Sequence, residues 1–451
     1  MRWTRYLNRS ICQNIPVLNS VLSSKQFSTL RYNTVKRLGK LVTMKIEKDA
    51  FQKVSTPELN VLSDLFKKYN YEIRIAGGAV RDLLSGKTPG DIDFATTATP
   101  DQMKEMFESE KIRMINKKGE KHGTITARIN DKENFEVTTL RIDIRTDGRH
   151  AEVEFTTDWQ LDANRRDLTV NAMFLGLDGT LYDYFNGRED LSNRKVCFVG
   201  DAASRIQEDY LRILRYFRFY GRIAEFPDSH DLKILSDIKE NANGLKDISG
   251  ERLWMEMKKI VVGNFAADLL TTMQQLDILK YLGFPENVNT NEVHKIWNRC
   301  KHLTPQPMTC AVSLLKTEEE LTKLHIRLKL SNDEVRLGYY IIANRDTLPT
   351  EDSMKFIKDL FLDSLAHKEP KAKDKICELL KYEGQDDLLD QFKAWEPPKF
   401  PVNGRSLLDI GFKGGPKIQK TLDRLRELWK ESNYTMTTEE LVKIAEEMKS
   451  T

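Results

Sequence analysis

Residues Ile75 to Pro100 combine a glycine turn, an arginine and two aspartates in a pattern that suits phosphate and metal chemistry. An apolar run, Ile73 to Ala76, ends in Gly77-Gly78 and leads into the helix-forming sequence AVRDLL, which places Arg81 one turn in. Glycine lets the backbone approach an anion closely, and the first N–H groups of a helix point at it. The stretch therefore predicts a strand, a tight turn and a helix start that bind phosphate.

Two aspartates follow in the sequence Asp91-Ile92-Asp93-Phe94. Residues i and i+2 of a strand share a face, so we expect both carboxylates to project together while Ile92 and Phe94 enter a core. Mg²⁺ typically takes one or two carboxylates and completes its shell with water and phosphate oxygens. A pair of such ions activates an attacking hydroxyl and neutralises a leaving phosphate. The pattern favours a site for divalent cations, with Asp91 and Asp93 as the catalytic ligands of two Mg²⁺ ions; two aspartates on a solvated strand edge are the alternative.

A D-x-D pair alone is compatible with several chemistries. A phosphatase of the haloacid dehalogenase type would have Thr or Val two places beyond the second Asp, where this chain has Ala95. A nucleotide-sugar glycosyltransferase would use the pair on Mn²⁺ but has no need of a Gly-Gly-x-x-Arg-Asp turn upstream. Nucleotidyl transfer needs one part to hold a triphosphate and another to hold the metals, so the combination favours it.

The sequence GGAVRD followed by DIDFAT resembles the signature of the polymerase-β-like nucleotidyltransferases. It is most similar to the class II tRNA nucleotidyltransferases (CCA-adding enzymes) and their relatives, the bacterial poly(A) polymerases. The resemblance extends over about residues 55 to 450. It implies an α/β head followed by an all-α neck, body and tail, and an activity that adds C, C and A to the 3′ end of tRNA from CTP and ATP.

Residues 55–190 alternate helical and strand patterns, which predicts the α/β catalytic head. Glu136 lies on the predicted strand NFEVTTLRI and is a candidate third metal ligand, although an ordinary exposed strand residue fits equally well. His122 and His150 are candidates for contact with phosphate, against the default of structural or surface histidines.

The segment Arg165-Arg166-Asp167 precedes the helical pattern LTVNAMF, which would put Asp167 and Asn171 one turn apart on one face. It resembles the family motif RRDxxxNA. The resemblance implies that Arg166 binds phosphate and that Asp167 and Asn171 lie near sugar hydroxyls. Together with the glycine turn and Arg81 they form the predicted triphosphate and ribose site.

Residues 195–265 are the predicted nucleotide-selecting neck, in which Glu208 to Phe219 read as one helix. Asp209 and Arg212 are then surface neighbours, which is compatible with an ordinary helix ion pair. Cytosine and adenine both present an amino donor beside a ring-nitrogen acceptor, so an Asp next to an Arg would accept C and A and reject U and G. The sequence resembles the family's EDxxR template motif, which implies base selection by Asp209 and Arg212, with Glu208 holding Arg212. Arg215, one turn further, belongs to the same predicted set.

The rest of the chain predicts helices. The run SGERLWMEMKK from Ser249 resembles the family's fifth motif, which implies a structural support for the template helix. Leucine-rich segments predict a helical body over 266–395, and a proline-rich linker precedes a tail at 402–451. In the tail, Lys413, Gly414, Gly415 and Lys417 surround a predicted helix start that could bind an RNA backbone phosphate.

Residues 1–43 contain eight basic residues and no acidic one, which is typical of a mitochondrial transit peptide; a basic RNA-binding arm is the alternative. A start at Met44 would give a cytosolic or nuclear form. Subtracting these eight charges from the net charge of +3 leaves −5, so RNA contact must come from local basic patches. Five scattered cysteines indicate a reducing compartment, and no apolar run is long enough to span a membrane. Monomer and homodimer both remain open.

Two further functions compete with CCA addition. A poly(A) polymerase would share the head, but that family carries a Gly-Arg/Lys-Arg/Lys-Phe segment after the metal strand, where this chain has Lys118-Gly119-Glu120-Lys121. A non-catalytic RNA-binding protein would not need both aspartates, the glycine turn and Arg166. Both comparisons favour CCA addition.

Overall fold

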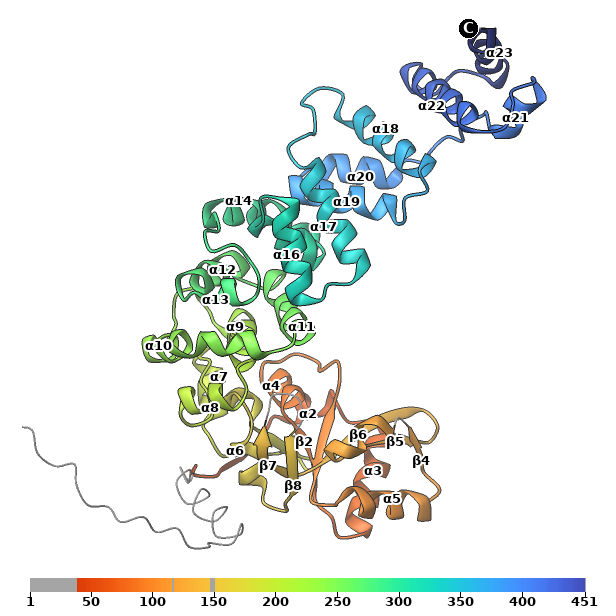
Figure 1. Ribbon diagram of the computed structural model, residues 1–451. Coiled ribbons are helices and arrows are strands. Elements are labelled where there is room, and N and C mark those ends of the chain that lie inside the picture. The colour runs from red at the N-terminus through yellow and green to blue at the C-terminus, as the bar shows by residue number, and fades with distance from the viewer. Residues whose placement is uncertain (1–38, 116, 147–150, 451) are drawn as a thin grey trace, which may run out of the picture.

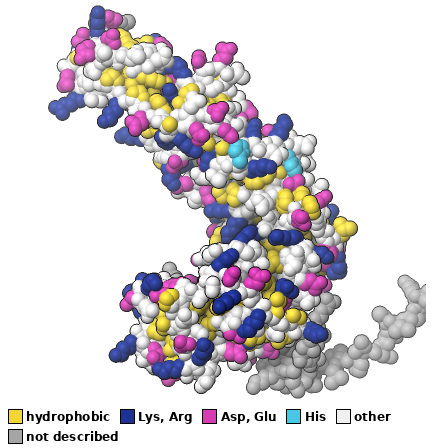
Figure 2. All heavy atoms as spheres, turned by 180° about the vertical axis from the view of Figure 1, so that it is seen from behind, with side chains coloured by type: hydrophobic (Ala, Val, Ile, Leu, Met, Phe, Trp, Pro, Cys, Tyr) yellow, Lys and Arg dark blue, Asp and Glu magenta, His cyan; other side chains and the backbone are white. Residues whose placement is uncertain are grey.

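The computed structural model describes residues 39–115, 117–146 and 151–450, which form a hook. The head lies at one end, the tail helices lie at the other, and the helices between them curve around a concave side (Figures 1 and 2). Figure 2 also shows Lys and Arg side chains gathered where the head meets the helical part. The expected α/β head followed by a helical region is confirmed.

An eight-stranded mixed sheet forms the head. Its order is β1-β10-β9-β2-β3-β6-β5-β4, and β3 and β6 run parallel whereas the other described pairs are antiparallel. The strands are β1 (Val42–Lys45), β2 (Ile73–Ala76), β3 (Asp93–Thr96), β4 (Arg113–Ile115), β5 (Thr124–Ile129), β6 (Glu133–Thr139), β9 (Phe174–Gly176) and β10 (Thr180–Asp183). A separate hairpin joins β7 (Arg141–Thr146) to β8 (Ala151–Phe155). The central position of β2 and β3 places the glycine turn and the metal strand side by side.

Helices with clear start signals cover the sheet. The Thr56 hydroxyl accepts from the N–H of Leu59 at the start of α3 (Pro57–Lys68), and Thr99 and Gln102 form a capping box at α5 (Pro100–Ser109). Their apolar faces pack Phe66 and Phe107 edge to face, 6.1 Å apart. The remaining head helices are α2 (Lys48–Gln52), α4 (Gly78–Leu84), α6 (Trp159–Asn164) and α7 (Gly187–Ser192).

The neck departs from the sequence prediction. The single helix expected over Glu208–Phe219 is wrong, because α8 (Ala202–Glu208) ends before Asp209 and α9 (Arg212–Ile223) begins after Leu211. Asp209 has an extended backbone (φ −155°), and one of its carboxylate oxygens accepts from the N–H of Leu211. Asp209 therefore belongs to neither helix, and its side chain bonds to the turn that leads into α9.

Two other local predictions are also wrong. The metal strand begins at Asp93, and Asp91 lies in the bend before it. The helix expected after Arg166 is only a 3₁₀ turn, Thr169–Asn171, because the chain must enter the short strand β9 three residues later.

Helices continue to the end of the described chain, and no helix in this part of the protein is long and apolar enough to cross a membrane. Neck and body contain α10 (Leu232–Asn241), α11 (Gly250–Val261), α12 (Ala266–Gln275), α13 (Ile278–Tyr281), α14 (Thr290–Cys300), α15 (Pro307–Ala311), α16 (Glu318–Leu328), α17 (Asn332–Asn344), α18 (Ser353–Ala366), α19 (Ala372–Glu383) and α20 (Asp386–Ala394). The tail contains α21 (Gly404–Asp409), α22 (Pro416–Glu431) and α23 (Thr438–Ser450) around its own core, in which Leu425 and Trp429 are buried.

Candidate active site

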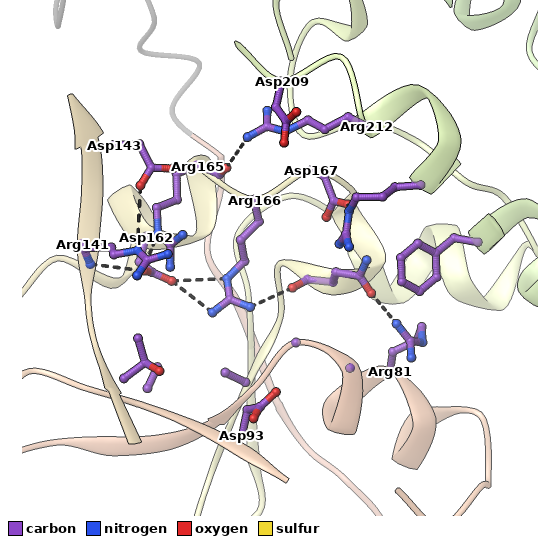
Figure 3. Close-up of a pocket in the computed structure, with 18 of the residues that line it drawn as sticks. Arg81, Asp93, Arg141, Asp143, Asp162, Arg165, Arg166, Asp167, Asp209 and Arg212 are labelled. Atoms are coloured by element: carbon purple, nitrogen blue, oxygen red, sulfur yellow. Dashed lines mark hydrogen bonds and ion pairs between the residues drawn. The ribbon is translucent and has the colours of Figure 1, made fainter. Parts of the chain in front are cut away.

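A cleft of about 740 Å³ lies between the head and the neck. Every basic residue that lines it is an arginine: Arg81, Arg141, Arg165, Arg166, Arg212, Arg215, Arg218 and Arg252. Six acidic residues share the walls: Asp93, Glu136, Asp143, Asp162, Asp167 and Asp209. The planar guanidinium group pairs with two phosphate oxygens at once, so this lining suits a polyphosphate. Figure 3 shows Asp93 at one wall, Asp209 and Arg212 at the other, and Arg166 between them.

The carboxylates for a metal come from two adjacent strands. Asp93 and Glu136 are direct partners in the parallel register of β3 and β6, and both side chains are exposed toward the cleft. Asp91 is also exposed, in the bend before β3. Partial burial and the nearby charge of Asp91 raise the pKa of Asp93, and the opposing effect of Arg166 is smaller. A bound cation would offset this repulsion between the two carboxylates.

These three carboxylates do not form a complete metal site by themselves. In the described part of the chain, no three His, Cys, Asp or Glu side chains converge as a ready-made set of ligands. Mg²⁺ normally takes one or two protein carboxylates and draws its other ligands from water and substrate phosphates. The donor set at Asp91, Asp93 and Glu136 therefore fits a divalent ion that binds together with a triphosphate.

The glycine turn lies directly beside this wall. Gly77 has φ +64°, and a Cβ there would come 2.9 Å from Nη1 of Arg166, so only glycine allows this approach of backbone to arginine. Arg166 donates to the Asp162 carboxylate from Nε and Nη2 (3.2 and 3.1 Å) and to the Asn171 carbonyl from Nη1 (3.1 Å). The guanidinium is thus fixed at the turn.

A buried aspartate organises this arginine. Asp162 is 1% exposed and also accepts from Nε of Arg165 and from the N–H of Arg141. Burial alone would raise the pKa of Asp162, but Arg166 and Arg165 outweigh it and hold the pKa below its usual value. Asp162 therefore stays ionised and keeps both arginines at the cleft. The sequence reasoning missed it.

Two predicted phosphate and sugar residues contact each other. Nη1 of Arg81 donates to Oδ1 of Asn171 at 2.5 Å, and Arg81 also pairs with Asp82 at 3.0 Å. Arg81 is buried, and its guanidinium lies over the ring of Phe219, 4.9 Å from the centroid. The other amide atom, Nδ2 of Asn171, is buried without a hydrogen-bond partner. An unpaired donor that lines the cleft is suited to a ligand oxygen.

Asp167 joins the head to the neck. Its carboxylate accepts from Nε of Arg215 on α9 at 2.5 Å. Burial raises the pKa of Asp167 and the Arg215 guanidinium lowers it, with a net shift below the usual value. Asp167 was predicted to contact the sugar and Arg215 to select the base. The two residues form an ion pair with each other.

The predicted base-selecting residues form the far wall. Arg212 donates from Nη1 to Oε2 of Glu208 at 2.6 Å, as the sequence predicted, and from Nη2 to the Arg165 carbonyl of the head at 3.1 Å. Asp209 does not pair with Arg212 but with Arg252 of α11, at 2.7 Å. The alternative interpretation, an ordinary helix ion pair between Asp209 and Arg212, is therefore wrong, and the two side chains are held separately.

Two residues that the sequence did not predict line the cleft, and several predicted candidates lie outside it. Arg141 and Asp143 of β7 line the cleft, and Nε of the first and Oδ1 of the second are buried without hydrogen bonds. The sequence of β7 has an ordinary composition and contains no motif that would have predicted their role. His122 is exposed and does not line the cleft, and His150 falls outside the described residues. Lys413, Gly414, Gly415 and Lys417 are exposed in the tail, at the opposite end of the hook from the head (Figure 1).

Comparison with known proteins distinguishes between the two families that share such a head. The family model for the Poly A polymerase head domain matches residues 73–197, and the model for the probable RNA and SrmB- binding site of polymerase A matches residues 231–287. CCA tRNA nucleotidyltransferase 1, mitochondrial, of Homo sapiens is 55% identical over 406 residues, which cover 89% of this chain and 93% of the human protein. The same-named protein of Danio rerio is 53% identical over the same shares.

The chain belongs to the CCA-adding tRNA nucleotidyltransferases. Its activity is that of a CCA tRNA nucleotidyltransferase. Its head is of the polymerase-β-like type, which typically uses divalent metals. The fold of this CCA-adding enzyme matches the crystal structure of the Bacillus stearothermophilus CCA-adding enzyme in complex with CTP, with a TM-score of 0.70, 25% identity, and coverage of 90% of this chain and 98% of that one. A Thermotoga maritima CCA-adding enzyme complexed with tRNA shares the fold, with a TM-score of 0.63, 19% identity, and coverage of 90% and 98%.

Proposed function

We propose that the cleft binds CTP or ATP with its triphosphate at the glycine turn and its base at the neck, and that Asp91, Asp93 and Glu136 hold two Mg²⁺ ions beside it. The observation that carries the proposal is the in-register pairing of Asp93 with Glu136 next to Gly77. When bound, the ions would neutralise the triphosphate and lower the pKa of the RNA 3′ hydroxyl. That hydroxyl attacks the α-phosphate, and pyrophosphate leaves.

Residues of the head orient the nucleotide. Arg166, fixed by Asp162, presents its guanidinium to the phosphates beside the free N–H groups at the start of α4. The unpaired Nδ2 of Asn171 donates to a ribose oxygen, and its Oδ1 stays with Arg81. Asp167 lies near the sugar hydroxyls. Its ion pair with Arg215 fixes the head against the neck.

Residues of the neck select the base. The Asp209 carboxylate accepts from the exocyclic amino group of cytosine or adenine, and Arg212 donates to the neighbouring ring nitrogen. Uracil and guanine present the opposite pattern, a ring N–H beside a carbonyl, so they would set donor against donor at Arg212 and acceptor against acceptor at Asp209. Glu208 holds Arg212 in place through its 2.6 Å hydrogen bond.

The tail supplies contact with tRNA far from the chemistry. Lys413 and Lys417 are exposed on either side of Gly414-Gly415, and the 16-residue helix α22 starts at Pro416. A helix N-terminus flanked by lysines attracts a backbone phosphate, which positions RNA without reading its sequence. Structures of similar enzymes hold CTP and tRNA, and we assign CTP, ATP and tRNA as the ligands of this chain.

Residues 1–43 direct the chain to mitochondria in this proposal, as the names of its vertebrate relatives suggest. Translation from Met44 would give a second, cytosolic or nuclear form. That form would lack Val42 and Thr43 of β1, which pair with Asp183 and Tyr182 of β10. Fusion of residues 1–43 to a fluorescent reporter tests the import signal, and a reporter left in the cytosol would refute it.

The reaction itself is tested with a tRNA transcript that lacks its last three nucleotides. CTP alone should give two additions, a third should appear only when ATP is also present, and growth should then stop. Extension into a long A ladder, or a failure to add C, would contradict the proposed nucleotide sites. EDTA should abolish every addition, and Mg²⁺ should restore it.

A further inference from the structure

Asp209 lies in the break between α8 and α9, so no helix fixes its side chain. Two hydrogen bonds orient the carboxylate. Oδ1 accepts from the N–H of Leu211 at 3.2 Å, and Oδ2 accepts from Nη2 of Arg252 at 2.7 Å. Arg252 belongs to α11, more than 40 residues further along the chain, and it lines the same cleft.

Arg212 is fixed by different elements. Its Nη1 contacts Glu208 and the Arg205 carbonyl of α8, and its Nη2 contacts the Arg165 carbonyl of the head. Arg212, the proposed donor to the base, is therefore held by α8 and the head, whereas Asp209, the proposed acceptor, is held by the adjacent turn and by α11. A change in α11 can disturb one half and leave the other in place.

We propose that Arg252 is a specificity-determining positioning residue, which holds the Asp209 carboxylate in the orientation that accepts the amino group of cytosine or adenine. The inference rests on the proposed base-selecting role of Asp209. A carboxylate oxygen has two lone pairs, so Oδ2 can accept from Arg252 and from a base amino group together. The SGERLWMEMKK segment, which the sequence predicted to be structural, would then act on nucleotide choice.

Without this arginine, Asp209 would be free to rotate about its side-chain bonds, because the contact with Leu211 alone leaves Oδ2 unheld. A mobile carboxylate forms a weaker hydrogen bond with the amino group of the base, so discrimination against uracil and guanine falls. Loss of a hydrogen bond to a charged group typically costs enough free energy to lower the discrimination between bases about ten-fold or more.

The test compares Arg252→Gln, Arg252→Lys and the wild-type full-length enzyme. The readout is the ratio of kcat/KM for CTP over UTP, and for CTP over the triphosphate of a cytidine analogue that lacks the 4-amino group. Arg252→Gln should lower both ratios about ten-fold, and Arg252→Lys should recover part of the loss. Lys259→Gln removes the same charge from an exposed position of α11 and should leave both ratios unchanged.

Asp209→Asn distinguishes the base-selecting role of Asp209 from the positioning role of Arg252. Loss of base discrimination in Asp209→Asn without any loss in a folded Arg252→Gln enzyme would overturn the role of Arg252 alone. Unchanged discrimination in Asp209→Asn would overturn the base-selecting role and this inference with it. Adding Arg252→Gln to Asp209→Asn should change the ratios no further, since one route carries both effects. An equal fall in rate with all nucleotides, with a lower Tm, would show a merely structural role and contradict the inference.

Discussion

Asp93 and Glu136 are register partners across β3 and β6, the parallel strand pair at the centre of the described head sheet. Their 43-residue separation in sequence hides this relationship, which the parallel pairing creates. The Asp93 and Glu136 carboxylates line the cleft next to the glycine turn, and Asp91 is exposed in the bend that precedes β3.

Replacing Asp93 with Asn should lower kcat/KM for CTP addition by about a thousand-fold or more, because metal-assisted charge stabilisation contributes several kcal/mol to the barrier. Glu136→Gln should show a smaller loss that grows as the Mg²⁺ concentration falls. Glu108→Gln, at an exposed position of α5, is the matched control. Steady-state rates over a Mg²⁺ titration measure all three, and a Glu136→Gln enzyme with wild-type Mg²⁺ dependence would remove Glu136 from the metal site.

The same carboxylates should destabilise the metal-free protein. The folded-state pKa of Asp93 is raised, so above its unfolded pKa of about 3.9 the charged side chain costs stability. In EDTA, Asp93→Asn should therefore raise Tm at pH 7 and change it little at pH 4. Mg²⁺ with CTP should raise the Tm of the wild type and have a much smaller effect on the variant. A lower Tm for Asp93→Asn in EDTA at pH 7 would show that the charge is compensated within the protein.

The ion pair between Asp167 and Arg215 should matter for stability as well as for activity. Arg215→Leu leaves a buried carboxylate without its cation, which typically costs about 3 to 5 kcal/mol. The pKa of Asp167 is depressed, so the stability difference from wild type should be complete at pH 7 and should shrink as the pH falls below about 4. Urea unfolding at a series of pH values measures it. The double variant Asp167→Asn/Arg215→Leu should recover part of the lost stability. If the double variant were destabilised as much as Arg215→Leu or more, the result would argue against an ion-pair effect.

The tail should contribute to RNA affinity without affecting nucleotide choice. Lys413→Ala and Lys417→Ala should each raise KM for tRNA and reduce the slope of log affinity against log salt by about 1, as expected for loss of a phosphate contact. Base selection should stay unchanged. Lys443→Ala, at an exposed position of α23, is the control. An unchanged salt slope in both variants would remove the glycine loop from the RNA-binding surface.

The sequence was sufficient for elements with strong local signals. The turn at Gly77, the capped helices α3 and α5, and the helical character beyond residue 265 follow from glycine, capping residues and apolar periodicity. These signals act within a few residues of the chain, and the structure retains them.

Features that depend on distant partners were not predictable. No Gly or Pro marks the break at Asp209, which is stabilised by Arg252 of another helix. The three-residue strand β9 is too short for periodicity to detect, and its pairing with β2 displaces the helix expected after Asp167. Asp162 lay in an ordinary polar stretch, and only burial between two arginines reveals its part in the site.

Base selection by protein side chains is the central claim, and sequencing of 3′ ends tests it most directly. Wild-type and Arg212→Ala enzymes would be given a tRNA that lacks its last three nucleotides, together with all four nucleoside triphosphates. Wild type should produce ends that read CCA. Arg212→Ala, with its fold verified by circular dichroism, should work more slowly and add U and G at a measurable fraction of ends. Ends that still read CCA throughout in this variant would contradict the assignment of Arg212 to base selection.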